Sequence, residues 1–142
     1  MSAAPLFLAF IAGIHVKQLN NEQAQTTVRY KWLTQNPFRS MYFACLAMAA
    51  EMSTGLLVMN LFADLKPPVS MLITQSNSVY LKKAVGKITF TCNDGNRIAE
   101  ALRKLQTQEN GVTIELKSTG INSDNEIVAE YTFTWSLKAK AK

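Results

Sequence analysis

Glu51 is the only charged side chain in the mostly apolar segment 41–62. Burying an unpaired charge is costly, so this carboxylate must find partners or take up a proton. A partly buried carboxylate that is ionised near neutral pH can act as a general base on water or as a nucleophile. A carboxylate satisfied at a solvent edge or at a subunit contact is the alternative, and the residue alone leaves both open.

The side chains that share a helix face with Glu51 are mostly small. Ala47, Met48, Thr54 and Gly55 stand three or four residues from it, which places them on the same side of a predicted helix. Small neighbours leave room for a substrate, and they equally allow close packing against another element. Thr54 could orient the carboxylate, or its hydroxyl could bond to the backbone of its own helix.

The segment that holds Glu51 is long enough to cross a bilayer, but it also contains Ser53, Thr54 and Asn60. The alternating strands predicted elsewhere in the chain need a helix to cover one face. We therefore expect the core helix of a globular domain and no membrane span. The earlier apolar run 6–13 follows no Lys or Arg and is not typical of a signal peptide.

The composition is that of one folded domain. The chain has 142 residues, of which 48% are hydrophobic and 18% charged, a balance that suits a packed core and argues against disorder. We expect a single domain over residues 1–142, with a frayed basic tail at about 138–142. The net charge of +5 fits a nucleic acid, an anionic membrane or a phosphorylated small molecule. No strand face interleaves aromatic with basic side chains, so we expect no nucleic acid partner.

Residue types that hold metals or form nucleophile triads are scarce. His15 is the only histidine, and Cys45 and Cys92 both lie in apolar runs. We predict an exposed strand histidine, two buried free thiols, no metal site and no need for an oxidising compartment. The sequence lacks a glycine-rich phosphate loop and Gly-x-Ser-x-Gly, which argues against the common nucleotide-binding and serine-hydrolase classes. We expect a cytoplasmic protein without a cofactor.

Hydrophobic periodicity predicts the elements that must position Glu51. Strand-like alternation lies on both sides of the long apolar helix, and Gly, Asn and Pro mark the turns. One-sided strands belong to an antiparallel sheet with one covered face, and a helix that is apolar nearly all round should be enclosed. The fold class is therefore α+β. We expect helices at 6–11, 41–62 and 97–106, and strands at Ile14–Leu19, 26–33, 71–81, Lys87–Cys92, 112–116 and 127–136.

Two further features resemble the phenylacetate-pathway type of acyl-CoA thioesterase, in the hotdog superfamily. That family carries an Asn before the central helix and an acid fifteen positions later. Asn36 and Glu51 have this spacing, since 51 − 36 = 15, and the segment 50–55 (AEMSTG) resembles the family's Ala-Asp-x-x-x-Gly. The segment 81–88 resembles the stretch leading into the family's next strand. The resemblance covers about residues 6–137, and the nearest branch is catalogued as a domain of unknown function.

The resemblance implies a hotdog fold, in which a curved antiparallel sheet wraps around a long central apolar helix. It also implies hydrolysis of an acyl thioester of coenzyme A or acyl carrier protein, with coenzyme A as part of the substrate and no cofactor beyond water. Glu51 would be the base or nucleophile, and Asn36 would position water or polarise the carbonyl. An Asn before a Pro is also ordinary turn chemistry.

The start of the predicted helix departs from the family. Residues 41–44 (MYFA) stand where the family has His-Gly-Gly, whose backbone N–H groups form the oxyanion hole. Phe43 and Ala44 could still donate their N–H groups, while the bulk of Tyr42 and Phe43 narrows the approach. This departure favours an alternative function, a non-catalytic module that binds acyl-CoA or lipid.

The remaining candidate residues concern the carrier and a second subunit. The resemblance implies a homodimer or a tetramer of dimers in which matching strands pair, so Gln75 and Asn77 in the polar middle of one strand could contact substrate. Lys82, Lys83 and Arg39 are candidates for the phosphates of coenzyme A. A solvated strand face and a solvated run of charges are the corresponding alternatives.

Overall fold

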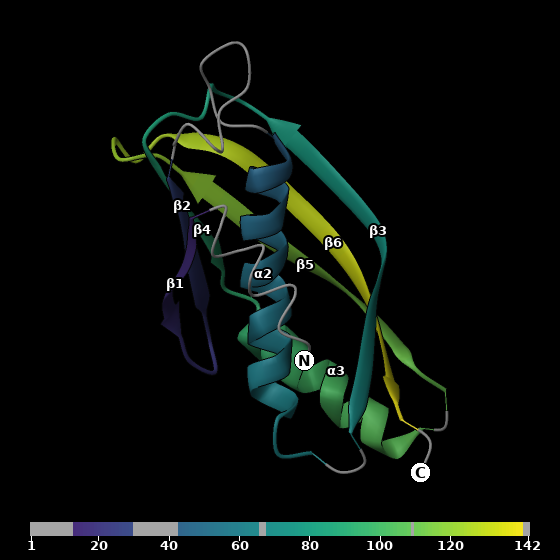
Figure 1. The fold of residues 1–142 in the computed structure, drawn as a ribbon. Coiled ribbons are helices and arrows are strands. Elements are labelled where there is room, and N and C mark those ends of the chain that lie inside the picture. Colours follow the sequence, from purple (N-terminus) through teal and green to yellow (C-terminus); the bar gives the residue numbers. More distant parts are fainter. Residues whose placement is uncertain (1–12, 30–42, 66–67, 109, 141–142) are drawn as a thin grey trace.

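The structure is a computed structural model that describes residues 13–29, 43–65, 68–108 and 110–140. Its elements follow the chain as a strand pair, a long helix, two strands, a short helix and two long strands (Figure 1). Their bounds are β1 Ile14–Leu19, β2 Ala24–Arg29, α2 Phe43–Phe62, β3 Val69–Tyr80, β4 Lys87–Cys92, α3 Gly95–Thr107, β5 Val112–Ile121 and β6 Ile127–Ala139.

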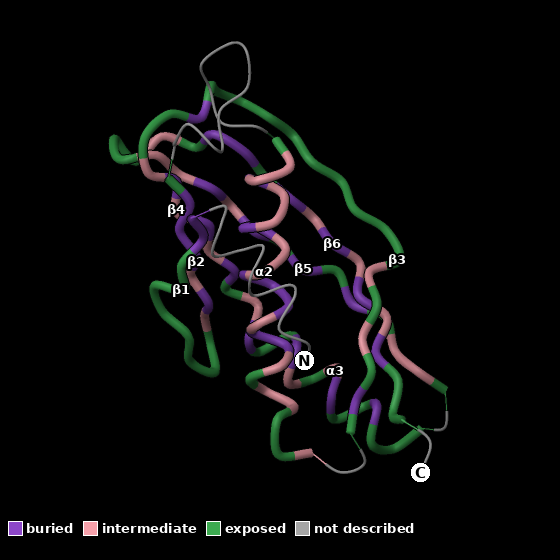
Figure 2. The backbone as a smooth tube through the Cα atoms, viewed as in Figure 1, coloured by how far each residue is buried: buried purple, intermediate pink, exposed green. Residues whose placement is uncertain are grey.

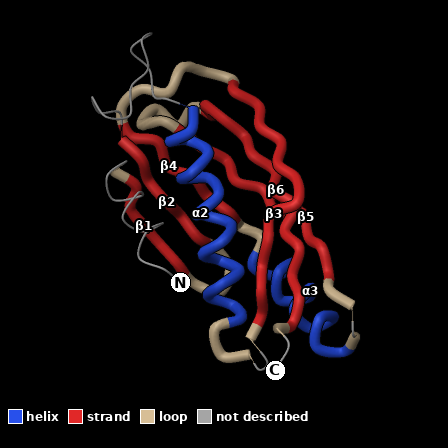
Figure 3. The backbone as a smooth tube through the Cα atoms, turned by 45° about the vertical axis from the view of Figure 1, so that its right-hand side comes forward, coloured by secondary structure: helices blue, strands red, loops and turns tan. Residues whose placement is uncertain are grey.

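The six strands form one sheet in the order β1-β2-β4-β5-β6-β3. Every neighbouring pair is antiparallel, and the sheet curves around α2 (Figures 1 and 3). Strands β4, β5 and β6 alternate buried and exposed or half-buried side chains along most of their length, because only one face of the sheet is covered by the helix. The predicted α+β architecture, with a curved sheet around a long apolar helix, is confirmed.

Helix α2 supplies the centre of the core. Leu46, Ala49, Ala50, Leu57 and Val58 are buried against the sheet. Small residues at the middle of this row let the helix lie close to the strands. The helix is long and apolar enough to cross a membrane by composition, yet one side of it packs on the strands as a core helix.

Helix α3 fills the place where β4 and β5 separate. These two strands pair only where Thr89, Phe90 and Thr91 face residues 119–121. Ile98, Leu102 and Leu105 of α3 are buried, and the helix contacts both α2 and β5. Asp94, just before the helix, accepts a hydrogen bond from the main-chain N–H of Lys117 at 2.9 Å, which satisfies a donor of β5 that β4 does not reach.

The element boundaries differ from the sequence expectations at a few places. β2 ends its described part at Arg29 and β3 begins at Val69. The expected frayed tail is corrected at its first residues: Lys138 pairs with Ser70, and the N–H of Lys140 donates to the carbonyl of Pro68 at 2.7 Å. The predicted helix at 6–11 and the last residues of the predicted strand 26–33 lie outside the described residues.

Candidate functional site

Glu51 lies on the side of α2 that faces β6 and β3. Gly55, one turn further along the same helix face, shows which strands that face meets. A Cβ placed on Gly55 would meet the ring of Trp135 at 3.4 Å and the terminal methyl of Met71 at 3.8 Å. Trp135 belongs to β6 and Met71 to β3, so Glu51 turns toward the last two strands of the sheet.

The carboxylate of Glu51 is half-buried. Burial raises the pKa of this carboxyl above its ordinary value, because the charged form loses solvation. In the part of the chain that the structure describes, no hydrogen bond or ion pair reaches the carboxylate. An acid with a raised pKa and open oxygen atoms can accept a proton from a bound water molecule near neutral pH.

Three hydrogen bonds fix α2 on the sheet around Glu51. The Thr26 hydroxyl of β2 donates to the carbonyl of Ala49 at 2.6 Å. The hydroxyls of Ser53 and Ser118, the latter in β5, lie 2.6 Å apart, and the Trp135 indole N–H donates to Thr54 Oγ1 at 3.0 Å. The helix is therefore tied to β2, β5 and β6 within one turn of Glu51, which fixes the backbone from which the Glu51 side chain extends.

Thr54 has the second of the two roles that the sequence left open, a hydrogen bond to the backbone of its own helix. Its hydroxyl donates to the main-chain carbonyl of Glu51 at 2.9 Å and accepts the bond from Trp135. A hydroxyl has a single proton to donate. Thr54 therefore ties the helix to β6 and does not hold the Glu51 carboxylate.

The register of β3 corrects the expectation for Gln75 and Asn77. Opposed residues of an antiparallel pair point to the same face of the sheet. Gln75 pairs with Thr134 and Asn77 with Thr132, and these partners lie on the face away from α2, because Phe133 between them faces the core.

The positions beside the helix belong to two serines instead. Ser76 pairs with Phe133, and Ser78 pairs with Tyr131. A register shift between Ile73 and Gln75 sets this arrangement. Sequence reasoning missed Ser76 and Ser78, since five consecutive polar residues give no apolar alternation from which to assign a face.

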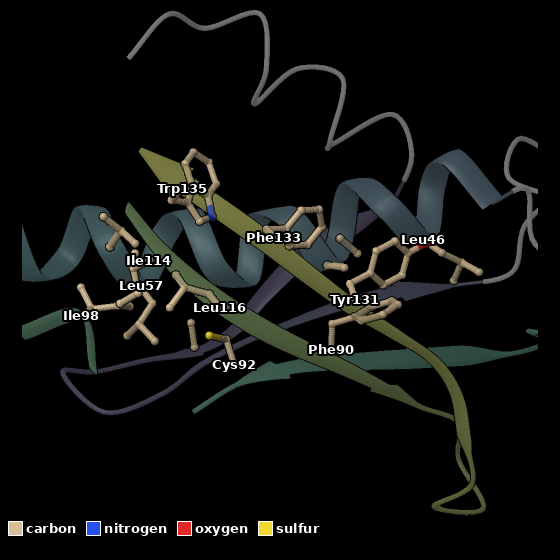
Figure 4. Close-up of a cluster of buried hydrophobic side chains, with 14 of the residues drawn as sticks. Leu46, Leu57, Phe90, Cys92, Ile98, Ile114, Leu116, Tyr131, Phe133 and Trp135 are labelled. Carbon is tan, nitrogen blue, oxygen red and sulfur yellow. The ribbon is translucent and has the colours of Figure 1, made fainter. Parts of the chain in front are cut away.

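A row of aromatic rings continues this side of the site toward the start of α2. Figure 4 shows Trp135, Phe133 and Tyr131 along β6 beside the helix. Tyr131 stacks on Phe133 with centroids 5.6 Å apart. Tyr80, at the end of β3, meets Tyr131 edge-on at 5.8 Å and Phe43 at 6.5 Å. This aromatic wall belongs to the core along β6, where Tyr131, Phe133 and Trp135 are buried, and it reaches the surface at Tyr80 and Phe43. No short sequence motif could have identified it.

The helix start places two of the expected residues at the end of this wall. Phe43 and Ala44 are the first described residues of α2, and the Phe43 side chain is 57% exposed. N–H groups in a first helical turn point out of the helix and can meet a negative charge. The other expected residues of this region, Asn36, Arg39 and Tyr42, lie outside the described residues.

The two lysines proposed for phosphate binding have different surroundings. Lys82 forms an ion pair with Glu126, and this contact holds the pKa of Glu126 below its ordinary value. Lys83 is exposed. An anion would have to compete with Glu126 for Lys82, so Lys83 is the better placed of the two.

Cys92 and His15 lie as predicted, whereas Cys45, predicted to be buried, is half-buried. Cys45 and Cys92 are free thiols, half-buried and buried respectively. Burial raises the pKa of Cys92 to about 12, which removes it as a nucleophile at neutral pH. His15 is exposed in β1. Among the residues that the structure describes, no group of His, Cys, Asp and Glu could hold a metal ion.

A groove of about 390 Å³ lies elsewhere, between α3 and the start of β5. No residue of α2 or β3 contributes to it, so it is separate from the surroundings of Glu51. Its lining residues are Asn96, Arg97, Glu100, Ala101, Lys104, Val112, Thr113 and Ile114.

Comparison with known proteins places this arrangement in a family. The family described as "Domain of unknown function (DUF4442)" matches residues 1–137, while no curated protein matches the chain. A protein of unknown function from Pseudomonas aeruginosa, named "Probable Thioesterase", is 16% identical with a TM-score of 0.84. The similarity covers 97% of this chain and 91% of that one.

Two other solved structures have the same architecture. A protein of unknown function from Chlorobaculum tepidum is 14% identical, with a TM-score of 0.82 over 95% of this chain and 88% of that one. A thioesterase from Haemophilus influenzae is 13% identical, with a TM-score of 0.72 over 95% and 85%. At these identities the likeness shows the fold, which is the hotdog fold.

Proposed function

Because the chain belongs to the DUF4442 family and has a thioesterase-like hotdog fold, we propose that it hydrolyses an acyl thioester of coenzyme A or acyl carrier protein. The observation that carries this proposal is Glu51, a half-buried carboxylate with a raised pKa on a helix tied to three strands. The exposed end of the aromatic wall, at Tyr80 and Phe43, supports an apolar acyl group, which we propose to be medium or long fatty, or aromatic.

In this mechanism the Glu51 carboxylate takes a proton from a bound water molecule while the water oxygen bonds to the thioester carbon. The carbonyl electrons move onto oxygen, and the negative charge is met by N–H groups at the start of α2, those of Phe43 and Ala44. When the carbonyl re-forms, the carbon–sulfur bond breaks. The leaving thiolate takes the proton from Glu51, so the carboxylate is regenerated. Asn36 would hold the water or the carbonyl.

We also propose that the active form is at least a homodimer. β3 is an edge strand of the sheet, and it is exposed over most of its length (Figure 2). Leu72 on this strand is 66% exposed, and Val79 is also exposed. A long, exposed edge with apolar side chains favours pairing with another strand, and a second copy of the chain would supply one.

A non-catalytic module that binds acyl-CoA is the second candidate. The bulky Phe43 side chain at the helix start favours it, since a large ring there narrows the approach to the N–H groups. In this case Lys83 would meet the phosphates of coenzyme A and the acyl group would lie against the exposed end of the aromatic wall, without turnover.

A substrate panel with two matched variants tests the proposal. Purified protein is offered acyl-CoAs of different chain length, and hydrolysis is followed by loss of the ultraviolet absorbance of the thioester bond. We expect Glu51→Gln to lose about 100-fold or more in kcat/KM, the usual contribution of a general base. Glu115→Gln, an exposed carboxylate on the outer sheet face, is the control and should retain activity.

The outcomes separate the two candidates. Turnover that Glu51→Gln leaves intact removes Glu51 from the mechanism. Saturable binding of acyl-CoA without turnover identifies the binding module. A protein that neither binds nor hydrolyses any member of the panel contradicts both.

A further inference from the structure

The hydroxyl groups of Tyr80 and Tyr131 lie 2.6 Å apart. Their rings meet edge-on, with centroids at 5.8 Å and an interplanar angle of 89°. The two residues differ sharply in exposure: Tyr131 is 4% exposed, between the rings of Phe90 and Phe133, whereas Tyr80 is 45% exposed. The pair therefore links the interior of the protein to its surface.

The burial of Tyr131 decides which hydroxyl donates. Each phenol has one proton to give. Within the part of the chain that the structure describes, Tyr80 is the only hydrogen-bond partner of the Tyr131 hydroxyl. A buried donor without an acceptor costs about 1–3 kcal/mol, so Tyr131 donates to Tyr80. Burial raises the pKa of Tyr131, so this hydroxyl keeps its proton at physiological pH.

Tyr80 is then left with its own O–H directed away from the pair. The Tyr131 donor occupies one side of Tyr80 Oη, so the Tyr80 proton is left to the other side. A hydroxyl that accepts one hydrogen bond is a stronger donor of its own. Tyr80 is therefore a polarised donor whose direction is fixed by a buried partner.

Tyr80 lies on the sheet face that α2 covers, close to the start of the helix. Tyr80 pairs with Ala129, which places its side chain on the sheet face that α2 covers. Its ring contacts Phe43 at the helix start, 6.5 Å between centroids. Ser78 and Ser76 follow on the same face of β3 toward the level of Phe133.

We propose that the Tyr80 hydroxyl donates a hydrogen bond to the carbonyl oxygen of the bound thioester and forms part of the oxyanion hole, with Tyr131 as its positioning residue. The inference rests on the proposed function. As the water oxygen bonds to the carbonyl carbon, the developing oxyanion accepts the Tyr80 bond without taking the proton. As the carbon–sulfur bond breaks, the electron pair of the oxyanion re-forms the carbonyl double bond, and the negative charge leaves with the thiolate. Tyr80 thus adds a hydrogen-bond donor beside the start of α2, where the bulky Phe43 lies.

A cycle of phenylalanine variants tests the pair by kinetics. Tyr80→Phe keeps the ring against Phe43 and removes both the proposed donor and the acceptor of the Tyr131 proton. We expect its kcat to fall about 10- to 100-fold with little change in KM, toward the lower end of what an oxyanion donor contributes. Tyr131→Phe should fall less, because the Tyr80 proton loses only its fixed direction. The double variant should equal Tyr80→Phe, since Tyr131 acts only through Tyr80.

Two kinetic results would overturn the inference. The first is a Tyr80→Phe enzyme that matches wild type while Glu51→Gln is inactive; the proposed function then stands without Tyr80. The second is a Tyr131→Phe loss that persists in full on the Tyr80→Phe background, which would show that Tyr131 acts by a separate route.

A binding measurement tests the donor without turnover. Two non-hydrolysable acyl-CoA analogues are compared by calorimetry: a ketone that keeps the carbonyl and a thioether that lacks it. Wild type should bind the ketone about 2- to 10-fold more tightly, the range for one neutral hydrogen bond, and Tyr80→Phe should bind both equally. This pattern in a protein without turnover supports the Tyr80 contact and rejects hydrolysis. Equal affinity of wild type for the two analogues overturns the contact.

Discussion

The buried serine pair between α2 and β5 gives an asymmetric prediction. Ser53 and Ser118 are 0% and 1% exposed, and their hydroxyl oxygens lie 2.6 Å apart. Ser53 donates its proton to the carbonyl of Ala50 at 2.7 Å, so the proton between the two serines must come from Ser118. The two alanine substitutions therefore remove different things, although they break the same bond.

The loss of stability expected for each variant follows from the direction of the hydrogen bond between the two serines. Ser118→Ala leaves Ser53 bonded to Ala50 and removes one neutral hydrogen bond, which should lower the free energy of unfolding by about 0.5–1.5 kcal/mol. Ser53→Ala leaves the Ser118 O–H buried with no acceptor, and should cost about 1–3 kcal/mol. The double variant has no orphaned donor. Its cost should be smaller than the sum of the two single costs and no larger than that of Ser53→Ala.

Urea unfolding followed by circular dichroism measures these differences in unfolding free energy, with the same dependence of free energy on urea concentration expected for every variant. Thermal midpoints should fall by about 3 °C for each kcal/mol in a chain of this size. Ser123→Ala, at an exposed loop position, is the control and should change stability by less than about 0.5 kcal/mol. Equal losses for the two single variants, or a double variant that shows their full sum, would refute the assigned direction of the bond.

Three further predictions concern the same core. Because burial raises the pKa of Glu51 in the folded state, wild-type stability should decline as pH rises from the unfolded pKa through the folded one. Above this window Glu51→Gln should have a higher thermal midpoint than wild type, and the difference should vanish below about pH 4. A difference that persists below about pH 4 would contradict the burial effect. Thr54→Val should lower the free energy of unfolding in urea by about 1–3 kcal/mol, since the Trp135 indole N–H loses its buried acceptor. If Thr54→Ser is destabilised equally, the cause is lost packing and not the lost hydrogen bond. Gly120→Ala would place a Cβ 2.5 Å from the Phe90 ring and should lower the free energy of unfolding by about 1–3 kcal/mol through overpacking. Adding Phe90→Leu should recover part of this loss. A Gly120→Ala variant as stable as wild type would be inconsistent with the contact.

The sequence alone predicted those elements in which buried side chains recur at the regular spacing of a strand or a helix. β4 begins and ends where the alternation of 87–92 predicts, because one face of that strand meets the core and the other does not. The same reason explains α3, whose Ile98, Leu102 and Leu105 have helical spacing. The apolar run of α2 correctly predicts a core helix, but that helix is buried on one side only and is not enclosed all round. Glu51 as the candidate acid also came from the sequence, as the single charge in an apolar run.

The tertiary structure decided which groups accompany that acid. The polar run of β3 has no period, so only its pairing with β6 and the shift after Ile73 put Ser76 and Ser78 beside the helix, with Gln75 and Asn77 on the outer face. Tyr80 and Tyr131 are 51 residues apart in the chain, and no local pattern connects them. Strand register and the direction of a buried hydrogen bond depend on partners distant in sequence, because they are set by which backbone groups and side chains meet once the sheet has closed around the helix.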